Sequence, residues 1–169
     1  MTMTPLRISA VFILFGAQTL CAQVVLPPER GQQGTIHTNL FGLGLAAGPA
    51  SGIGLSFRHH LPGYFSYQIT GGIIKVDEVT SYAIGGEAQY DLMRGYGARF
   101  FVTGALGYYY HANRGGSNQL DGPTRVGFGI GGEVPSGGGM HFAGELVFTY
   151  FSDGTVLPLP QAGFYYYFY

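Results

Sequence analysis

The sequence predicts an all-β protein in which eight antiparallel strands follow one another up and down and close into a barrel. Three observations favour this fold. Glycine, which disfavours helices, accounts for 30 of the 169 residues. Charged residues make up 10% of the chain, well below the roughly 25% that is usual in soluble proteins. Apolar and polar residues alternate with a period of two, in segments that glycine- and proline-containing turns separate.

The alternating segments are about ten residues long, which is the length of a tilted β-strand that crosses a bilayer. We therefore expect a transmembrane barrel that occupies residues 34–169. Short turns such as 61–63, 93–97 and 135–139 are expected on the side of the chain ends, and the longest polar stretch, 112–123, on the other side. The eight expected strands are about 35–47, 53–60, 64–74, 79–92, 98–111, 124–134, 140–151 and 161–169.

Residues 1–22 have the features of a secretory signal peptide, which would form a helix. Arg7 supplies a positive charge, residues 8–16 form a short apolar core, and Ala22 is a small residue suited to cleavage. The apolar core is too short for a spanning helix, which needs about 20 residues. Cys21 opens a lipoprotein alternative, which Leu20 disfavours because lipoprotein signals carry a small residue there. Residues 23–33 are a short lead-in.

The parity of the alternation places most charged side chains of the strands on the inner face of the barrel. An eight-stranded barrel is just wide enough for side chains to fill it, and an unpaired charge inside would be costly. We expect a structural network of paired charges in which Glu87 lies opposite Arg99 and Glu133 lies close to His141. A narrow, gated ion path is the alternative. The expected network consists of Arg58, Glu87, Arg99, Arg125, Glu133, His141 and Glu145.

The segment 161–169 alternates around six consecutive aromatic rings, and it resembles the closing strand of bacterial outer-membrane barrels. The pattern of residues 34–169 resembles the small eight-stranded outer-membrane proteins, the group of the OmpA barrel domain, the OmpX/Ail type and the opacity-type porin-like proteins. This resemblance implies a bacterial outer-membrane location, contact with outer-membrane lipid and lipopolysaccharide, and recognition by the barrel-assembly machinery. The residues expected to carry that assembly signal are Tyr165, Tyr167, Phe168 and Tyr169.

On this interpretation we expect a structural, anchoring or surface-interaction role, with a filled lumen and a monomeric chain. A narrow porin-like channel for small solutes is the first alternative, and a secreted soluble β-sandwich or lipocalin-like barrel is another. A lipid A-modifying enzyme is a further alternative, but the local motif of lipid A deacylases, a His and a Ser two apart, is absent after His111. We expect no enzyme, no cofactor and no metal. Nucleic-acid binding is not expected either, because the sequence has no Lys/Arg cluster.

Overall fold

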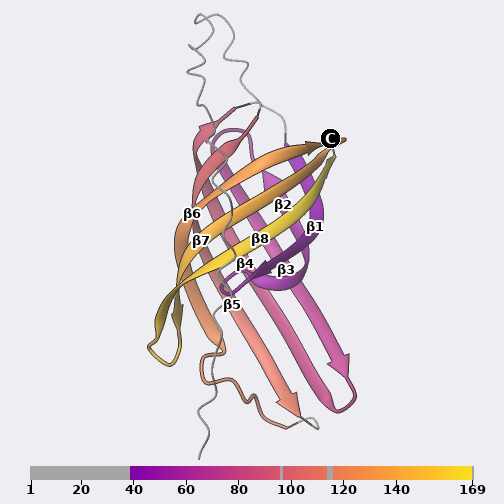
Figure 1. The fold of residues 1–169 in the computed structure, drawn as a ribbon, viewed down its shortest axis with the longest axis vertical. Helices are drawn as coiled ribbons and strands as arrows, with labels where there is room; N and C mark the ends of the chain where they lie inside the picture. The colour runs from indigo at the N-terminus through magenta and orange to yellow at the C-terminus, as the bar shows by residue number, and fades with distance from the viewer. Residues whose placement is uncertain (1–38, 96, 114–115, 169) are drawn as a thin grey trace, which may run out of the picture. The chain divides into compact units, whose positions relative to one another are not determined.

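The computed structural model describes residues 39–95, 97–113 and 116–168, and these residues form one closed antiparallel barrel (Figure 1). Each strand pairs with the next, and β1 pairs with β8 from Phe41–Phe168 to Ala47–Ala162, so the sheet has no open seam over that length. The predicted fold class, all-β with eight antiparallel strands in a closed barrel, is therefore confirmed. The strands are β1 (Leu40–Gly48), β2 (Gly52–His60), β3 (Phe65–Val76), β4 (Val79–Arg94), β5 (Arg99–Asn113), β6 (Thr124–Gly137), β7 (Met140–Phe151) and β8 (Val156–Phe168).

Alternation along each strand decides which side chains face the interior. In β5, for example, Phe101, Thr103 and Ala105 are buried, whereas Gly104 and Leu106, which alternate with them, are exposed. Because successive side chains of a strand point to opposite faces, this pattern fixes the register of the sheet. The inner and outer faces match those that the parity of the sequence predicts for β2, β4, β6 and β7.

The predicted strand bounds are wrong mainly at β8. Residues 152–160 were expected to lead into the closing strand, but β8 begins at Val156 and continues pairing with β7 through Pro158–Phe148 and Pro160–Leu146. The two prolines suggest a loop, yet they lie beyond the last pair with β1 at Ala162, where one side of β8 has no neighbour. Proline is tolerated on such an edge, because an unpaired edge needs no backbone donor. The expected signal peptide, the lead-in, the first residues of the first strand and Tyr169 lie outside the described residues.

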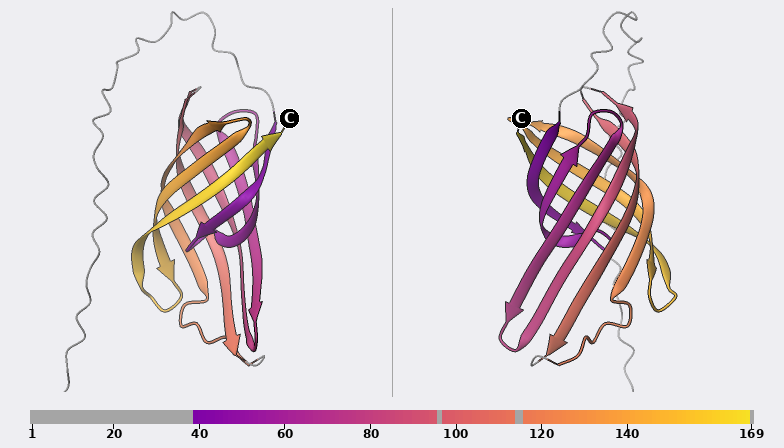
Figure 2. Two further views of the ribbon diagram at one scale, coloured as in Figure 1. Left: turned by 45° about the vertical axis from the view of Figure 1, so that its right-hand side comes forward. Right: turned by 180° about the vertical axis from the view of Figure 1, so that it is seen from behind.

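The two ends of the barrel differ. At the end where β1 begins and β8 ends, here called the terminal end, the connections are short (Figure 1). At the other end, here called the distal end, the β3–β4 hairpin and the last residues of β5 extend well beyond the β1–β2 hairpin (Figure 2). The ladder between β2 and β3 stops at Leu55–Gly71, although β3 continues to Val76. The wall of the barrel is therefore lower at β1 and β2 than at β3–β5, and we call this gap on the distal side of β1 and β2 the notch.

Apolar side chains lie mostly outside the barrel and polar ones mostly inside. Phe128 is 66% exposed and Leu55 is 68% exposed, and similar residues on the other strands form a belt around the barrel. The buried apolar side chains, by contrast, are mainly alanines and tyrosines. Soluble monomers rarely expose a contiguous apolar surface of this kind. Among the described residues no helix is long and apolar enough to cross a membrane.

Candidate functional site: the filled lumen and a lateral pocket

Glu133, on the inner face of β6, is the centre of the lumen network. Its Oε2 atom accepts hydrogen bonds from Arg58 Nη1 at 2.5 Å and from Arg99 Nη2 at 2.9 Å. The hydroxyl of Tyr167 donates to the same oxygen at 3.2 Å, and His141 Nδ1 lies 3.0 Å from Oε1. One carboxylate thus joins strands β2, β5, β7 and β8 across the interior. This arrangement satisfies the requirement that a buried charge be paired and hydrogen-bonded.

The two guanidinium groups have further partners that fix their orientation. Arg58 is 1% exposed, donates to Gln68 Oε1 through both Nε and Nη2, and stacks its guanidinium 4.0 Å from the centre of the Tyr165 ring. Arg99 donates to Asp91 Oδ1 at 2.9 Å and to Gln89 Oε1 at 2.7 Å. Planar guanidinium groups suit such multidentate sites, which are both strong and geometrically specific.

Two more carboxylates, Glu87 and Glu145, accept hydrogen bonds from the same two side-chain amides. Gln161 Nε2 donates to Glu145 Oε2 at 3.0 Å and to Glu87 Oε2 at 3.4 Å. Gln89 Nε2 donates to Glu87 Oε1 and, at 3.4 Å, to Glu145 Oε1. Arg58 Nη2 lies 3.7 Å from Glu145 Oε1. The lumen is therefore crossed by side chains that bond to one another.

The residues singled out from the sequence fall into three groups. Arg58, Glu87, Arg99, Glu133 and Glu145 meet in the lumen network. His141 joins the network through Glu133, with its side chain 28% exposed. Arg125 does not join it: its guanidinium lies over the rings of Tyr109 and Phe151 near the distal end.

The predicted pairing of Glu87 with Arg99 is wrong. Glu87 lies opposite Ala105, and Arg99 lies opposite Arg94, because the β4–β5 ladder continues to the pair Arg94–Arg99 next to the turn. The bulge between Asp91 and Met93 changes the register there by one residue. Arg99 finds its carboxylates in Asp91 and Glu133 instead. The expected partner of Glu133, His141, is the observed one.

The residues of the expected assembly signal are divided between the two faces of β8. Tyr165 and Tyr167 point into the lumen, where their hydroxyl groups bond to Gln68 and Glu133. Phe168 is on the outer face, and Tyr169 lies outside the described residues. Recognition of this strand by an assembly machinery stays a prediction.

The turn between β1 and β2 closes the distal part of the lumen by folding inward. Ala50 is 0% exposed and Ser51 is 2% exposed, although they form the tip of a hairpin. Gln161 Oε1 accepts hydrogen bonds from Ser51 Oγ at 3.1 Å and from the Ala50 N–H at 3.4 Å. The Tyr109 hydroxyl accepts from the Gly52 N–H at 3.0 Å and donates to the Gly48 carbonyl. We call residues 49–51 the inserted turn.

Glycines on three other strands provide the space for the inserted turn. A Cβ atom at Gly85 would lie 2.5 Å from the backbone of Ser51, and one at Gly107 would lie 2.5 Å from the Ala50 carbonyl oxygen. A Cβ atom at Gly127 would lie 2.8 Å from the Ala50 side chain. These contacts are too close for any larger residue unless the turn moves. These glycines thus leave room for the backbone of the inserted turn as well as for its side chains.

Sequence reasoning missed the uncharged half of the network and the inserted turn. The glutamines and tyrosines that complete it lie on the same faces as the predicted charges, so parity was the signal that could have found them. They are Gln68, Gln89, Gln161, Tyr165 and Tyr167. The inserted turn has no comparable signal, because a Pro-Ala-Ser sequence is equally suited to an exposed loop.

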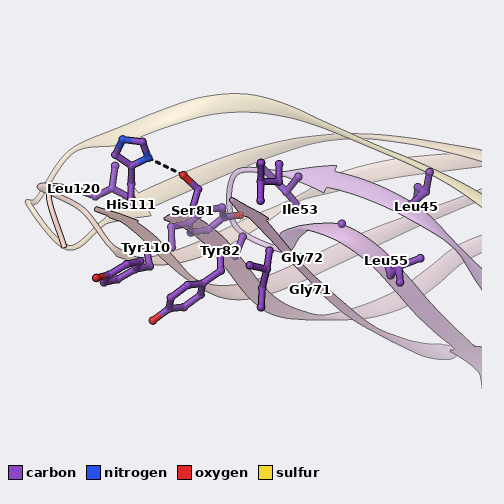
Figure 3. Close-up of a pocket in the computed structure, with 15 residues that line it drawn as sticks. Leu45, Ile53, Leu55, Gly71, Gly72, Ser81, Tyr82, Tyr110, His111 and Leu120 are labelled. Carbon is purple, nitrogen blue, oxygen red and sulfur yellow. Dashed lines mark hydrogen bonds between the residues drawn. The ribbon is translucent and has the colours of Figure 1, made fainter. Parts of the chain in front are cut away.

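A lateral pocket of about 550 Å³ lies at the notch, on the distal side of β1 and β2. Its lining includes the exposed apolar side chains of Leu45, Ile53 and Leu55 and, from the distal parts of β4 and β5, Ser81 and His111 (Figure 3). Ser81 Oγ and His111 Nδ1 are hydrogen-bonded at 2.7 Å across the β4–β5 ladder. A serine does face His111, therefore, but it comes from the neighbouring strand, which a local motif cannot reveal.

No family model, no curated protein and no solved structure matches this chain. Within the described residues, no group of three or more His, Cys, Asp or Glu side chains could hold a metal ion. The features that bear on function are therefore the closed barrel, its apolar outer face and its polar inner face.

Proposed function

We propose that this chain is an integral β-barrel protein of a bacterial outer membrane with a structural, anchoring or surface-interaction role. The observation that carries the proposal is the distribution of side chains, with an apolar belt outside and bonded charges inside. In water the belt would face an unfavourable solvent, whereas in lipid it provides the contact that membrane barrels need. A closed sheet also leaves no lipid-exposed backbone edge over the paired length.

The interior supports a closed barrel rather than a channel for small solutes. The network that spans from Arg58 to Glu133 and Arg99 occupies the terminal half of the lumen, and the inserted turn occupies the distal half. In planar-bilayer recordings, the reconstituted protein is therefore expected to give no current steps. Regular unitary steps would favour the alternative of a narrow porin-like channel.

Substituting a charged residue for an apolar one on the belt distinguishes a membrane barrel from a soluble barrel. Phe128→Arg is expected to destabilise a membrane barrel by about 2–4 kcal/mol, because the arginine would enter lipid near the middle of β6. In a soluble barrel the same substitution would replace an exposed ring with a hydrated cation and would leave stability unchanged or improved. Urea unfolding in lipid vesicles, followed by the shift in gel migration between unheated and boiled samples, measures the difference.

The control for this substitution is Lys75→Gln, which changes an exposed charge on the distal β3–β4 hairpin and is expected to have no measurable effect. Fractionation of cells that express the wild-type protein should recover it with outer membranes. Recovery of folded wild-type protein in the soluble fraction, without detergent, would refute the proposal.

A further inference from the structure

The lateral pocket differs from the rest of the lipid-facing surface because the barrel wall is interrupted there. β2 bends inward at Gly54, whose φ of +136° is accessible to glycine, and the start of β2 crosses the backbone of Gly72 on β3. Gly52 reaches Tyr109 on β5. The outer face of the β1–β2 hairpin thus becomes the floor of a recess, and β3–β5 continue past it as a wall.

The recess has an apolar end and a polar end. Leu45, Ile53 and Leu55 are 60%, 46% and 68% exposed and form the floor, which is continuous with the apolar belt. At the opposite end lies the hydrogen-bonded pair of Ser81 and His111 (Figure 3). A site of this composition suits a ligand with a long apolar part and a small polar head.

The polar end lies at the level where a lipid–water interface is expected. Tyr82 and Tyr110, the neighbours of Ser81 and His111, turn to the other face of the same strands and stack with 4.7 Å between ring centres (Figure 3). Tyrosine rings of membrane proteins concentrate at the interface because their bodies are apolar and their tips polar. A molecule in the recess would accordingly keep its head beside Ser81 and His111 and extend its chain along the floor towards the hydrocarbon.

The charge of the lining limits the head group. None of the described residues that line the pocket is a lysine, an arginine, an aspartate or a glutamate. A phosphate or carboxylate head would therefore lack a fixed countercharge, whereas a hydroxyl group can bond to a serine–histidine pair in either direction. The volume of about 550 Å³ lies within the range of about 300–1,000 Å³ that is usual for small-molecule pockets, which suits an amphiphile with one chain.

From these observations we propose that the lateral pocket binds a neutral, single-chain amphiphile that enters sideways from the membrane. The chain lies on Leu45, Ile53 and Leu55, and the hydroxyl bonds to Ser81 and His111. This inference rests on the proposed membrane location, since the recess opens onto the apolar belt.

The test uses the full-length protein in lipid vesicles and a photoreactive diazirine analogue of hexadecanol. The shift in gel migration on boiling first establishes that the barrel is inserted, so that failure of the proposed function is recognised before any labelling. Peptide mapping of the cross-linked protein then locates the probe. Saturable labelling around Ile53 and Ile73, competed by unlabelled hexadecanol, is expected.

Two matched pairs of variants separate the site from ordinary lipid contact. Ile53→Ser is expected to reduce saturable labelling at least about fivefold, whereas Ile69→Ser, at a similarly exposed position of the belt outside the pocket, leaves it unchanged. His111→Ala is expected to weaken competition by hexadecanol but not by hexadecane, and folding is preserved because His111 is exposed.

Labelling that does not saturate and is spread evenly over the belt of an inserted barrel would mean ordinary lipid contact only and would overturn the inference while leaving the proposed function intact. Equal competition by hexadecanoate and hexadecanol would overturn the assignment of a neutral head.

Discussion

Glu133 binds more polar side chains of the lumen than a single carboxylate usually does. Two arginines, a tyrosine and a histidine converge on its two oxygens. Removing one partner of a buried ion pair is usually more destabilising than never having had the pair, because the remaining charge stays desolvated. The stability of the barrel should therefore be unusually sensitive at this residue.

We predict that Glu133→Gln lowers the free energy of unfolding by about 3–5 kcal/mol, because it leaves Arg58 and Arg99 without their shared carboxylate. Urea unfolding in vesicles measures the change. Asp153→Asn, an equally conservative loss of charge in the exposed β7–β8 turn, is the matched control and should shift stability by less than about 0.5 kcal/mol. If both variants unfold at the same urea concentration, the network does not stabilise the barrel.

The charged residues of the lumen were predictable from the sequence, because parity alone assigns Arg58, Glu133 and Glu145 to one face. Their partners were less predictable. The β4–β5 ladder ends at the pair Arg94–Arg99 beside the turn, and this places Ala105 rather than Arg99 opposite Glu87. Faces follow from the period of the pattern, whereas cross-strand pairs also require the turn length and the position of bulges.

At the level of elements, the inserted turn determines how the distal end is built. Its backbone lies against Gly85 and Gly107, its Ala50 side chain lies against Gly127, and Gln161 connects it to the lumen carboxylates. A loop of five residues between two predicted strands gave no indication of this position. Only the glycines on the inner faces of three other strands were visible in the sequence, and their partner lies far away in the chain.

We predict that Gly85→Ala displaces the inserted turn, since the added methyl group would meet the backbone of Ser51 at 2.5 Å. Overpacking of this kind costs about 1–3 kcal/mol, which corresponds to about five- to 150-fold in the opening equilibrium. The measurement is the rate at which a membrane-impermeant maleimide labels Ser51→Cys in a chain that also carries Cys21→Ser. The rate should rise at least about fivefold.

Gly86→Ala is the matched control for this element, because it adds the same methyl group at the next residue, where the closest atom is the Gln68 carbonyl oxygen at 3.7 Å. Labelling of Ser51→Cys should stay slow in that background. Fast labelling without any glycine substitution would show that the turn is not inserted.

For the whole molecule, closure of the sheet between β1 and β8 is the feature on which the other arguments depend. The fold class was predictable because composition, strand length and turn residues all favoured it. The extent of β8 was not, because Pro158 and Pro160 are typical of loops and their tolerance depends on β1 ending early. Local sequence preferences do not reveal where a neighbouring strand ends.

We predict that Ala47→Cys and Ala162→Cys together form a disulfide on mild oxidation, in a chain that also carries Cys21→Ser. The two positions are opposite each other across the β1–β8 seam, and opposite Cβ atoms lie about 4.5–5.5 Å apart, a separation that small adjustments can bridge. Non-reducing gel electrophoresis of boiled samples detects the linked chain. Ala47→Cys with Ala88→Cys on β4 should stay unlinked, and equal linking of both pairs would contradict the register.

The position of the inserted turn also has a consequence for the order in which the barrel can be completed. Ala50 and Ser51 are made early by the ribosome, yet the Gln161 side chain that holds them is made 111 and 110 residues later. The inserted turn therefore cannot complete its hydrogen bonds until the closing strand has been synthesised, although Tyr109 on β5 is available to it earlier.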